Sequence, residues 1–122
     1  MNKLTDFYTL KNGVKVPCVG FGTWQTPDGD VARDSVKCAL ENGYRHIDTA
    51  YAYFNEKGVG EGIRASGVGR DGIFLTTKHW ITDRGYEKTV AECESSLANR
   101  GTDHVDLYLI HWPAVKKTFA DW

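Results

Sequence analysis

Cysteine is scarce in this sequence, and its spacing excludes the structures that cysteines usually build. The chain has 3 cysteines, Cys18, Cys38 and Cys93, which are odd in number and widely separated. This pattern matches neither a disulfide framework nor a zinc-binding motif. We therefore expect reduced thiols in a cytoplasmic protein, and no bound metal.

Long apolar runs and runs of one charge are also lacking. Residues 1–10 include Lys3 and Asp6 and contain no apolar segment of signal-peptide length. No stretch approaches the roughly 20 apolar residues of a membrane span. The formal net charge is -1 and there is no polybasic tract, so we expect neither nucleic acid nor a membrane surface as a partner.

The composition that remains is that of an ordinary globular protein, with 41% hydrophobic and 25% charged residues. No linker or low-complexity stretch divides the chain. We therefore expect residues 1–122 to form a single domain.

Runs with β propensity and helical patterns alternate along this domain. The pair Asn12-Gly13 lies between two short β-prone runs and predicts a β-hairpin. Strand starts then recur at about 30 residues, the length of a βαβ unit, so right-handed crossovers place the strands parallel in one sheet. The predicted strands are 18–22, 44–49, 73–78 and 105–111, and the predicted helices are 31–42, 56–66 and about 86–100.

The limits and faces of the helices follow from single residues. Asp30 and Asn55 are candidate N-caps, and Gly43, Gly67 and Gly101 follow the three predicted helices. In the third helix, apolar residues at helical spacing predict the buried face, and charged residues predict the exposed face. The first set is Val90, Cys93 and Leu97, and the second is Glu87, Lys88, Glu92 and Glu94.

This order of elements predicts the α/β class, in the form of a (β/α)8 TIM barrel. A complete barrel usually needs about 250 residues. With 122 residues, the chain accounts for an N-terminal hairpin, about the first four strands and three helices. Because a half barrel leaves its first and last strands unpaired, we expect self-association through exposed strand edges if the chain is this short.

Four polar side chains mark the predicted active site. Asp48, Tyr53, Lys78 and His111 each fall at or just after the carboxyl end of a predicted strand. In a parallel barrel, catalytic residues gather at that face. We therefore expect the four to share one site.

Together these four groups suit the reduction of a carbonyl. Hydride addition leaves an alkoxide, so the site must supply a proton. A phenol, which ordinarily titrates near about 10, becomes more acidic when a cation lies within roughly 4 to 6 Å. Lys78 is the candidate cation for Tyr53, Asp48 keeps that lysine charged and oriented, and a neutral His111 aligns the carbonyl or the phenol.

The segments that carry these residues resemble the N-terminal part of the aldo-keto reductase family, in family order and spacing. The matching segments are Gly20-Phe21-Gly22-Thr23-Trp24, residues 43–50 (Gly-Tyr-Arg-His-Ile-Asp-Thr-Ala), Tyr53-Phe54-Asn55-Glu56, Thr76-Thr77-Lys78 and residues 105–113 (Val-Asp-Leu-Tyr-Leu-Ile-His-Trp-Pro). The resemblance implies a (β/α)8 barrel closed at the bottom by the hairpin. It also implies NADPH-dependent reduction of aldehydes or ketones to alcohols.

The resemblance assigns roles to individual residues. It makes Tyr53 the proton donor and Asp48, Lys78 and His111 the other members of a catalytic tetrad. The cofactor contacts that this chain can supply are Gly22, Thr23 and Asp48, and the aromatic positions that shape the substrate pocket are Trp24, Trp80 and Trp112.

Two features depart from the family pattern. His79 stands where an aliphatic residue is common, a change that we expect to be tolerated or to tune the pocket. The family's later strands, which hold the nicotinamide carboxamide and the 2′-phosphate, have no counterpart in this chain. The alternative to an active reductase is therefore a half barrel that is inactive alone and acts only by association with another copy or with the missing half.

The other candidate groups receive structural interpretations. His46 shares the orientation of Asp48 and is expected to be a hydrogen-bonded core residue, and His104 is expected to be structural or exposed. The Gly20-x-Gly22 pair lacks the third glycine of a dinucleotide-binding fingerprint and does not open a helix, so it argues against a Rossmann fold.

Overall fold

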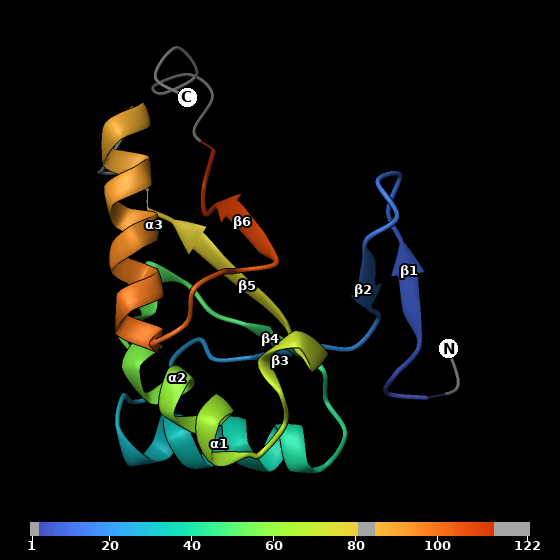
Figure 1. The fold of residues 1–122 in the computed structure, drawn as a ribbon. Coiled ribbons are helices and arrows are strands. Elements are labelled where there is room, and N and C mark those ends of the chain that lie inside the picture. The colour runs from blue at the N-terminus through green and yellow to red at the C-terminus, as the bar shows by residue number, and fades with distance from the viewer. Residues whose placement is uncertain (1–2, 81–84, 114–122) are drawn as a thin grey trace.

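The computed structural model of this chain describes residues 3–80 and 85–113. A two-stranded antiparallel hairpin is followed by a four-stranded parallel sheet, and three α-helices lie on one side of that sheet. The hairpin stands apart from the helices, across the sheet from them (Figure 1). This arrangement confirms the predicted α/β architecture.

The hairpin forms where the Asn-Gly pair predicted it. Strands β1 (Phe7–Thr9) and β2 (Lys15–Pro17) pair antiparallel, and Gly13 takes a φ of +84° in the turn. The side chain of Asn12 supports the turn by accepting a hydrogen bond from the Val14 amide at 3.1 Å. One hollow joins residues of the hairpin to the residues at the amino ends of the parallel strands, which places the hairpin at the bottom of the sheet.

The parallel sheet has the spatial order β3-β4-β5-β6, which is also the order along the chain. Its register pairs Gly22 with Asp48, Asp48 with Thr76, and Lys78 with Leu109. The carboxyl ends of the strands therefore meet at one edge. The strands are β3 (Phe21–Gly22), β4 (His46–Asp48), β5 (Phe74–His79) and β6 (Leu107–Ile110).

Three of the four strands are shorter than the sequence pattern predicts. The difference is largest at residues 18–22, where only Phe21–Gly22 is strand. The Cys18 amide donates instead to the Asp6 carbonyl at 2.8 Å, so this part of the chain belongs to the hairpin. Long-range backbone pairing, which the local pattern does not encode, decides these limits.

The helices begin and end close to the predicted limits. Gly43, Gly67 and Gly101 all have positive φ directly after or near a helix end, as expected of glycines that stop helices. A 3₁₀ turn, η1, follows β4, and a second, η2, precedes β5. The helical elements are α1 (Asp30–Glu41), η1 (Tyr51–Tyr53), α2 (Glu56–Ala65), η2 (Arg70–Gly72) and α3 (Tyr86–Arg100).

The two predicted N-caps do not act as caps. Gly29 occupies the N-cap position of α1 and Asp30 is the first helical residue, without a side-chain capping bond. Asn55 occupies the N-cap position of α2, but its buried amide donates to the carbonyls of Thr23 and Thr26. Local preference predicts a cap at both residues. In the structure, Gly29 occupies the N-cap position of α1, and tertiary contacts engage the side chain of Asn55.

The hydrophobic core lies between the sheet and the first two helices. Its members come from α1, α2, β4, β5 and the residue before β5, and they are Val36, Leu40, Ile47, Val59, Ile63, Ile73 and Leu75. Glycines let α2 approach its neighbours closely, since a Cβ at Gly60 would overlap the backbone of Arg100, and one at Gly62 would crowd Val36. The core thus fixes α1 and α2 against β4 and β5.

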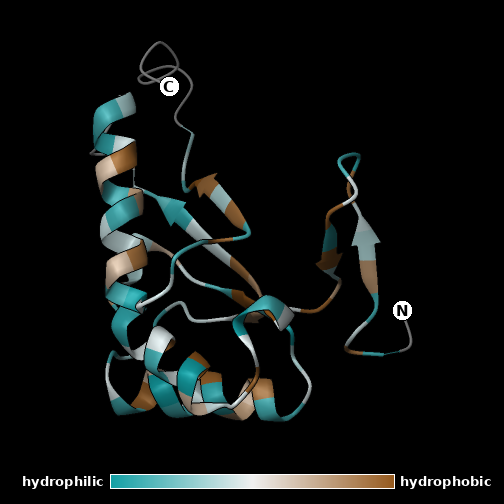
Figure 2. Cartoon of the chain, viewed as in Figure 1, coloured by the Kyte–Doolittle hydropathy of each residue, from teal (hydrophilic) through white to brown (hydrophobic). Residues whose placement is uncertain are grey.

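The predicted buried face of α3 is confirmed only in part, since Cys93 and Leu97 are half-buried. The buried residues of this helix are Glu92, Ser96 and Arg100, whereas Val90 is exposed and Glu92, predicted to face solvent, is 6% exposed. Figure 2 shows hydrophilic stretches of α3 alternating with shorter apolar bands. A polar network takes the place of an apolar stripe, because Arg100 pairs with the buried carboxylate of Glu56 on α2.

Candidate active site

Asp48 and Lys78 form the centre of the candidate site. Asp48 is the last residue of β4, and Lys78 lies one residue before the end of the neighbouring β5. The Lys78 ammonium donates to Asp48 Oδ1 at 2.5 Å and to the Thr49 carbonyl at 2.9 Å. Because the Lys78 side chain is only 14% exposed, this ion pair offsets much of the cost of removing the ammonium from water.

Tyr53 lies against this ion pair. The Lys78 Nζ atom is 5.2 Å from the centroid of the Tyr53 ring. The Tyr53 ring also meets the His111 ring edge to face, with centroids 5.5 Å apart and an interplanar angle of 81°. The structure therefore brings together all four side chains that the sequence predicts.

The loop that presents Tyr53 is held from beneath. Tyr53 ends η1, and the next residue, Phe54, takes a left-handed φ of +55° that turns the chain into α2. The side chain of Asn55 is buried, and its amide donates to the Thr23 carbonyl at 2.8 Å while its oxygen accepts from the Thr49 hydroxyl at 3.3 Å. Sequence reasoning missed this support, because it assigned Asn55 a local capping role.

His111 follows β6 and is kept in its neutral form. Burial lowers the pKa of His111 below its ordinary value of 6.5, the nearby Lys78 ammonium lowers it further, and Asp48 opposes the change. The His111 amide donates to the His79 carbonyl at 3.0 Å, which extends the β5-β6 pairing by one residue. A neutral imidazole in this place can donate one hydrogen bond and accept another.

The predicted cofactor contacts lie next to the ion pair. Gly22 is exposed at the end of β3, and no atom lies within 4 Å of where its Cβ would be, so its backbone is open to a ligand. Thr23 is fully buried, and both its amide and its hydroxyl donate to the Asp48 carbonyl. Of the three predicted contacts, the Gly22 backbone and the Asp48 carboxylate therefore lie side by side at the strand ends, while the Thr23 side chain faces inward.

The three tryptophans differ in their surroundings. Trp80 is half-buried, and its ring lies edge to face with that of His111 at a centroid distance of 5.3 Å. Trp24 and Trp112 are 68% and 62% exposed. Only Trp80 is in ring contact with a tetrad residue in the part of the chain that the structure describes.

The remaining histidines lie outside this cluster. His46 Nε2 is 3.0 Å from the Thr76 hydroxyl, and burial lowers the pKa of His46, in keeping with the structural role expected for it. His79 is 1% exposed and faces α3, so it does not line the pocket at the strand ends. Strand alternation points His79 away from the side of Lys78, so any effect of this residue on that pocket is indirect.

Comparison with known proteins decides the family. The profile of the Aldo/keto reductase family matches residues 18–121, most of the chain. The chain belongs to this family.

Within residues 3–80 and 85–113, the structure contains no helix that is long and apolar enough to cross a membrane and no group of three metal-ligating side chains.

Curated members of the aldo-keto reductase family are similar along the whole chain. A 9,11-endoperoxide prostaglandin H2 reductase of Trypanosoma cruzi is 51% identical over 122 residues, which cover 100% of this chain and 43% of the relative. A glyoxal reductase of Bacillus subtilis is 50% identical over 98% of this chain and 43% of its own length. The chain thus spans less than half the length of these reductases.

Solved aldo-keto reductases have the same fold over this region. The Brucella melitensis aldo/keto reductase superposes with a TM-score of 0.86 at 51% identity, covering 90% of this chain and 43% of that structure. A Bombyx mori aldo-keto reductase in complex with NADP has a TM-score of 0.82 at 38% identity, covering 91% and 39%. The hairpin, parallel sheet and three helices are therefore the N-terminal part of an aldo-keto reductase TIM barrel.

Proposed function

We propose that this chain carries the proton-donating part of the active site of an NADPH-dependent reductase that converts aldehydes or ketones to alcohols. The observation that supports this function is that Lys78 contacts both the Asp48 carboxylate and the Tyr53 ring, while the Tyr53 ring contacts that of His111. A phenol, an ammonium, a carboxylate and a neutral imidazole in one cluster can bind a carbonyl oxygen and protonate it.

Each member of the cluster has one role. Tyr53 donates its hydroxyl proton to the carbonyl oxygen of the substrate. The Lys78 ammonium stabilises the negative charge that the phenolate then carries, and Asp48 holds that ammonium in place. His111, uncharged at neutral pH, donates a hydrogen bond to the same carbonyl oxygen and fixes its orientation.

The cofactor and the substrate pocket are carried over from the family. NADPH supplies the hydride when it is bound, and the residues of this chain that the family resemblance assigns to it are Gly22, Thr23 and Asp48. The NADP complex of the Bombyx mori relative and the name glycerol 2-dehydrogenase (NADP(+)) of a Saccharomyces cerevisiae relative support this cofactor. The substrate is a small carbonyl compound, bound between Trp24, Trp80 and Trp112.

A second candidate is a half barrel that is inactive alone. It is favoured by the 43% coverage of the relatives and by two apolar hollows at the outer strands of the sheet, which none of the described residues covers. One lies beside β3 at Phe21 and Tyr44, and the other lies beside β6 at Ile110. In this candidate, these edges associate with another copy of the chain or with the missing half of the barrel. Sedimentation that finds only a monomer at high concentration would contradict association between copies.

Turnover by the chain and by two tyrosine variants tests the proposed function. The measurement is NADPH oxidation with an aromatic aldehyde, for the unchanged chain, Tyr53→Phe and Tyr51→Phe. Tyr51 lies in the same 3₁₀ turn but lines a different hollow, so its variant is the matched control. We expect Tyr53→Phe to lose at least about 100-fold in rate, because it lacks the general acid, and Tyr51→Phe to keep its rate.

The two candidates give different results in this assay. A rate that is lost in Tyr53→Phe alone supports the reductase. Equal turnover in both variants contradicts Tyr53 as the proton donor. No turnover in any of the three proteins favours the half barrel that is inactive alone.

A further inference from the structure

We propose that Glu92 is a positioning residue for this active site. It lies on α3, behind the sheet, and it holds the carboxyl end of β5 so that Trp80 and His111 keep their places. The inference takes its chemical meaning from the proposed function, but its test does not depend on turnover.

The carboxylate of Glu92 binds two consecutive residues at the end of β5. Its Oε1 atom accepts a hydrogen bond from the Trp80 amide at 2.9 Å and lies 3.1 Å from His79 Nδ1. The second contact is an ion pair whenever the imidazole is protonated. One carboxylate oxygen on the helix thus meets two nitrogens of the strand end.

Burial makes these contacts costly to break. The Glu92 side chain is 4% exposed and the His79 side chain 1%, so neither group has bulk water as an alternative partner. A buried carboxylate that loses its donors retains the full cost of its desolvation. The position of Glu92 therefore determines where the chain leaves β5.

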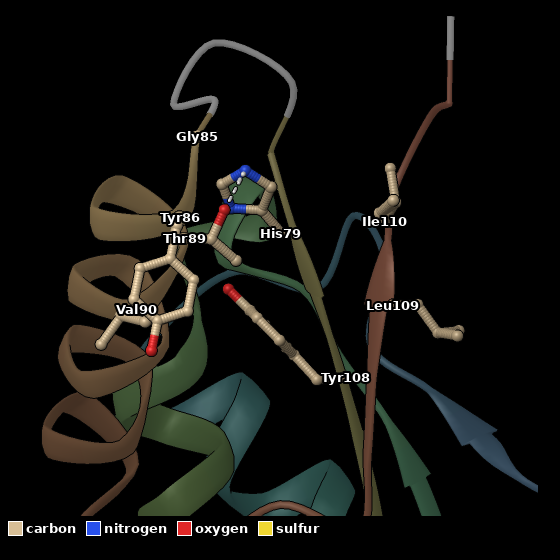
Figure 3. A pocket seen from close by; sticks show the side chains of 8 residues that line it. All are labelled: His79, Gly85, Tyr86, Thr89, Val90, Tyr108, Leu109 and Ile110. Atoms are coloured by element: carbon tan, nitrogen blue, oxygen red, sulfur yellow. Dashed lines mark hydrogen bonds between the residues drawn. The ribbon is translucent and has the colours of Figure 1, made fainter. Parts of the chain in front are cut away.

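The orientations of His79 and Lys78 explain how Glu92, which lies behind the sheet, affects the position of the active-site residues. Successive strand residues point to opposite faces, so Lys78 faces Asp48 while His79 faces α3. Figure 3 shows His79 and Tyr108 pointing toward α3, Leu109 pointing to the other side, and the contact of His79 with Thr89. That contact, between His79 Nε2 and the Thr89 hydroxyl at 3.5 Å, holds the second nitrogen of the ring.

His111 and Trp80 are coupled to the same anchor. The His79 carbonyl accepts the hydrogen bond of the His111 amide at 3.0 Å. The Trp80 ring, whose backbone amide is held by Glu92, lies edge to face with the His111 ring. A shift of the strand end at residues 79 and 80 therefore moves the imidazole and the indole together.

This arrangement also accounts for the departure of His79 from the family pattern. An aliphatic residue there would leave the Glu92 carboxylate with the Trp80 amide but without the imidazole. With the imidazole present, His79 Nδ1 lies beside the same carboxylate oxygen that accepts from the Trp80 amide. His79 and Glu92 thus act as a pair.

Nuclear magnetic resonance of Glu92→Ala and Glu92→Gln in the full chain tests this role. The readouts are hydrogen exchange of the Trp80 amide and the chemical shifts of the His111 ring. We expect exchange at Trp80 to accelerate at least about tenfold in Glu92→Ala, with a shift of the His111 signals, because one buried hydrogen bond is lost. Glu92→Gln keeps an oxygen acceptor of the same shape, so it restores part of the protection and also serves if the alanine variant does not fold.

Glu94→Gln is the matched control, because Glu94 is an exposed glutamate on the same helix. We expect it to leave Trp80 and His111 unchanged. Glu92 variants whose spectral changes stay within α3 and His79, with Trp80 exchange and His111 shifts as in the unchanged chain, would overturn the inference. A chain that shows the expected changes but never oxidises NADPH would refute the proposed function and leave the positioning role standing.

Discussion

Lys78 is the residue that connects the parts of the candidate site. Its ammonium is bound by the Asp48 carboxylate and the Thr49 carbonyl, and it faces the Tyr53 ring. These partners lie 25 to 30 positions away in sequence, so only the parallel sheet brings them together. The tetrad could be predicted from the sequence because its members lie at or just after strand ends, and parallel strands bring their carboxyl ends to one edge of the sheet.

The histidines predict how the stability of the protein depends on pH. The pKa values of His46 and His111 are both below 6.5 in the folded chain, chiefly because of burial. Near and below pH 6.5 the unfolded chain therefore binds more protons than the folded chain. The free energy of unfolding therefore has its full value above pH 6.5, and it decreases as the pH falls from 6.5 through the lowered pKa values of the two histidines.

Imidazole titration by nuclear magnetic resonance, together with denaturant unfolding above and below pH 6.5, checks this dependence. We expect both imidazoles to titrate below 6.5. A His46→Gln, His111→Gln double variant should show a smaller loss of stability on acidification than the unchanged chain. Titration of both rings above 6.5 would contradict the account of their burial.

At the scale of elements, the close approach of α2 and α3 depends on a missing side chain. A Cβ at Gly60 would overlap the carbonyl group of Arg100, which is backbone and cannot rotate away. We expect Gly60→Ala to lower the free energy of unfolding by about 2 to 3 kcal/mol, even though alanine favours helix. Chemical denaturation measures this change.

Gly69→Ala is the control for that substitution. Gly69 has a φ of -58° and no atom within 4 Å of its Cβ position. We expect its alanine variant to change stability by less than about 1 kcal/mol. A Gly60→Ala protein as stable as the Gly69→Ala protein would show that α2 and α3 do not pack as described.

The elements also show which features the sequence could predict. Helix ends depend on local glycines such as Gly43 and Gly101, and these were predicted correctly. The buried face of α3 was predicted only in part, because Arg100 finds its partner Glu56 on another helix, 44 positions earlier in the chain. Apolar spacing alone favoured Val90, which the structure leaves exposed.

The same distinction applies to the loops around the site. The support that Asn55 gives to η1 depends on Thr23 and Thr26, which lie 32 and 29 residues earlier. A local reading could see only an N-cap in this residue. Contacts between distant residues could thus be predicted when the residues lie at the ends of neighbouring strands. Contacts made by loop residues could not be predicted in this way.

At the scale of the whole molecule, the four tetrad residues all come from β4, β5, β6 and the turn after β4. All four residues of the proposed proton-donating cluster are therefore contained in a chain that spans 43% of its curated relatives. The cofactor contacts that the family places on later strands are not. Assembly of the tetrad and turnover are therefore separate properties of this chain, and each needs its own test.

The most direct test of the account is whether the chain in solution assembles these side chains. The measurement is the nuclear Overhauser effect between ring protons of Tyr53 and His111, whose centroids are 5.5 Å apart in the structure. We predict clear cross-peaks between the two rings in the folded chain. A folded chain without such cross-peaks would contradict the account, because Tyr53 would then lie away from the groups that make it a proton donor.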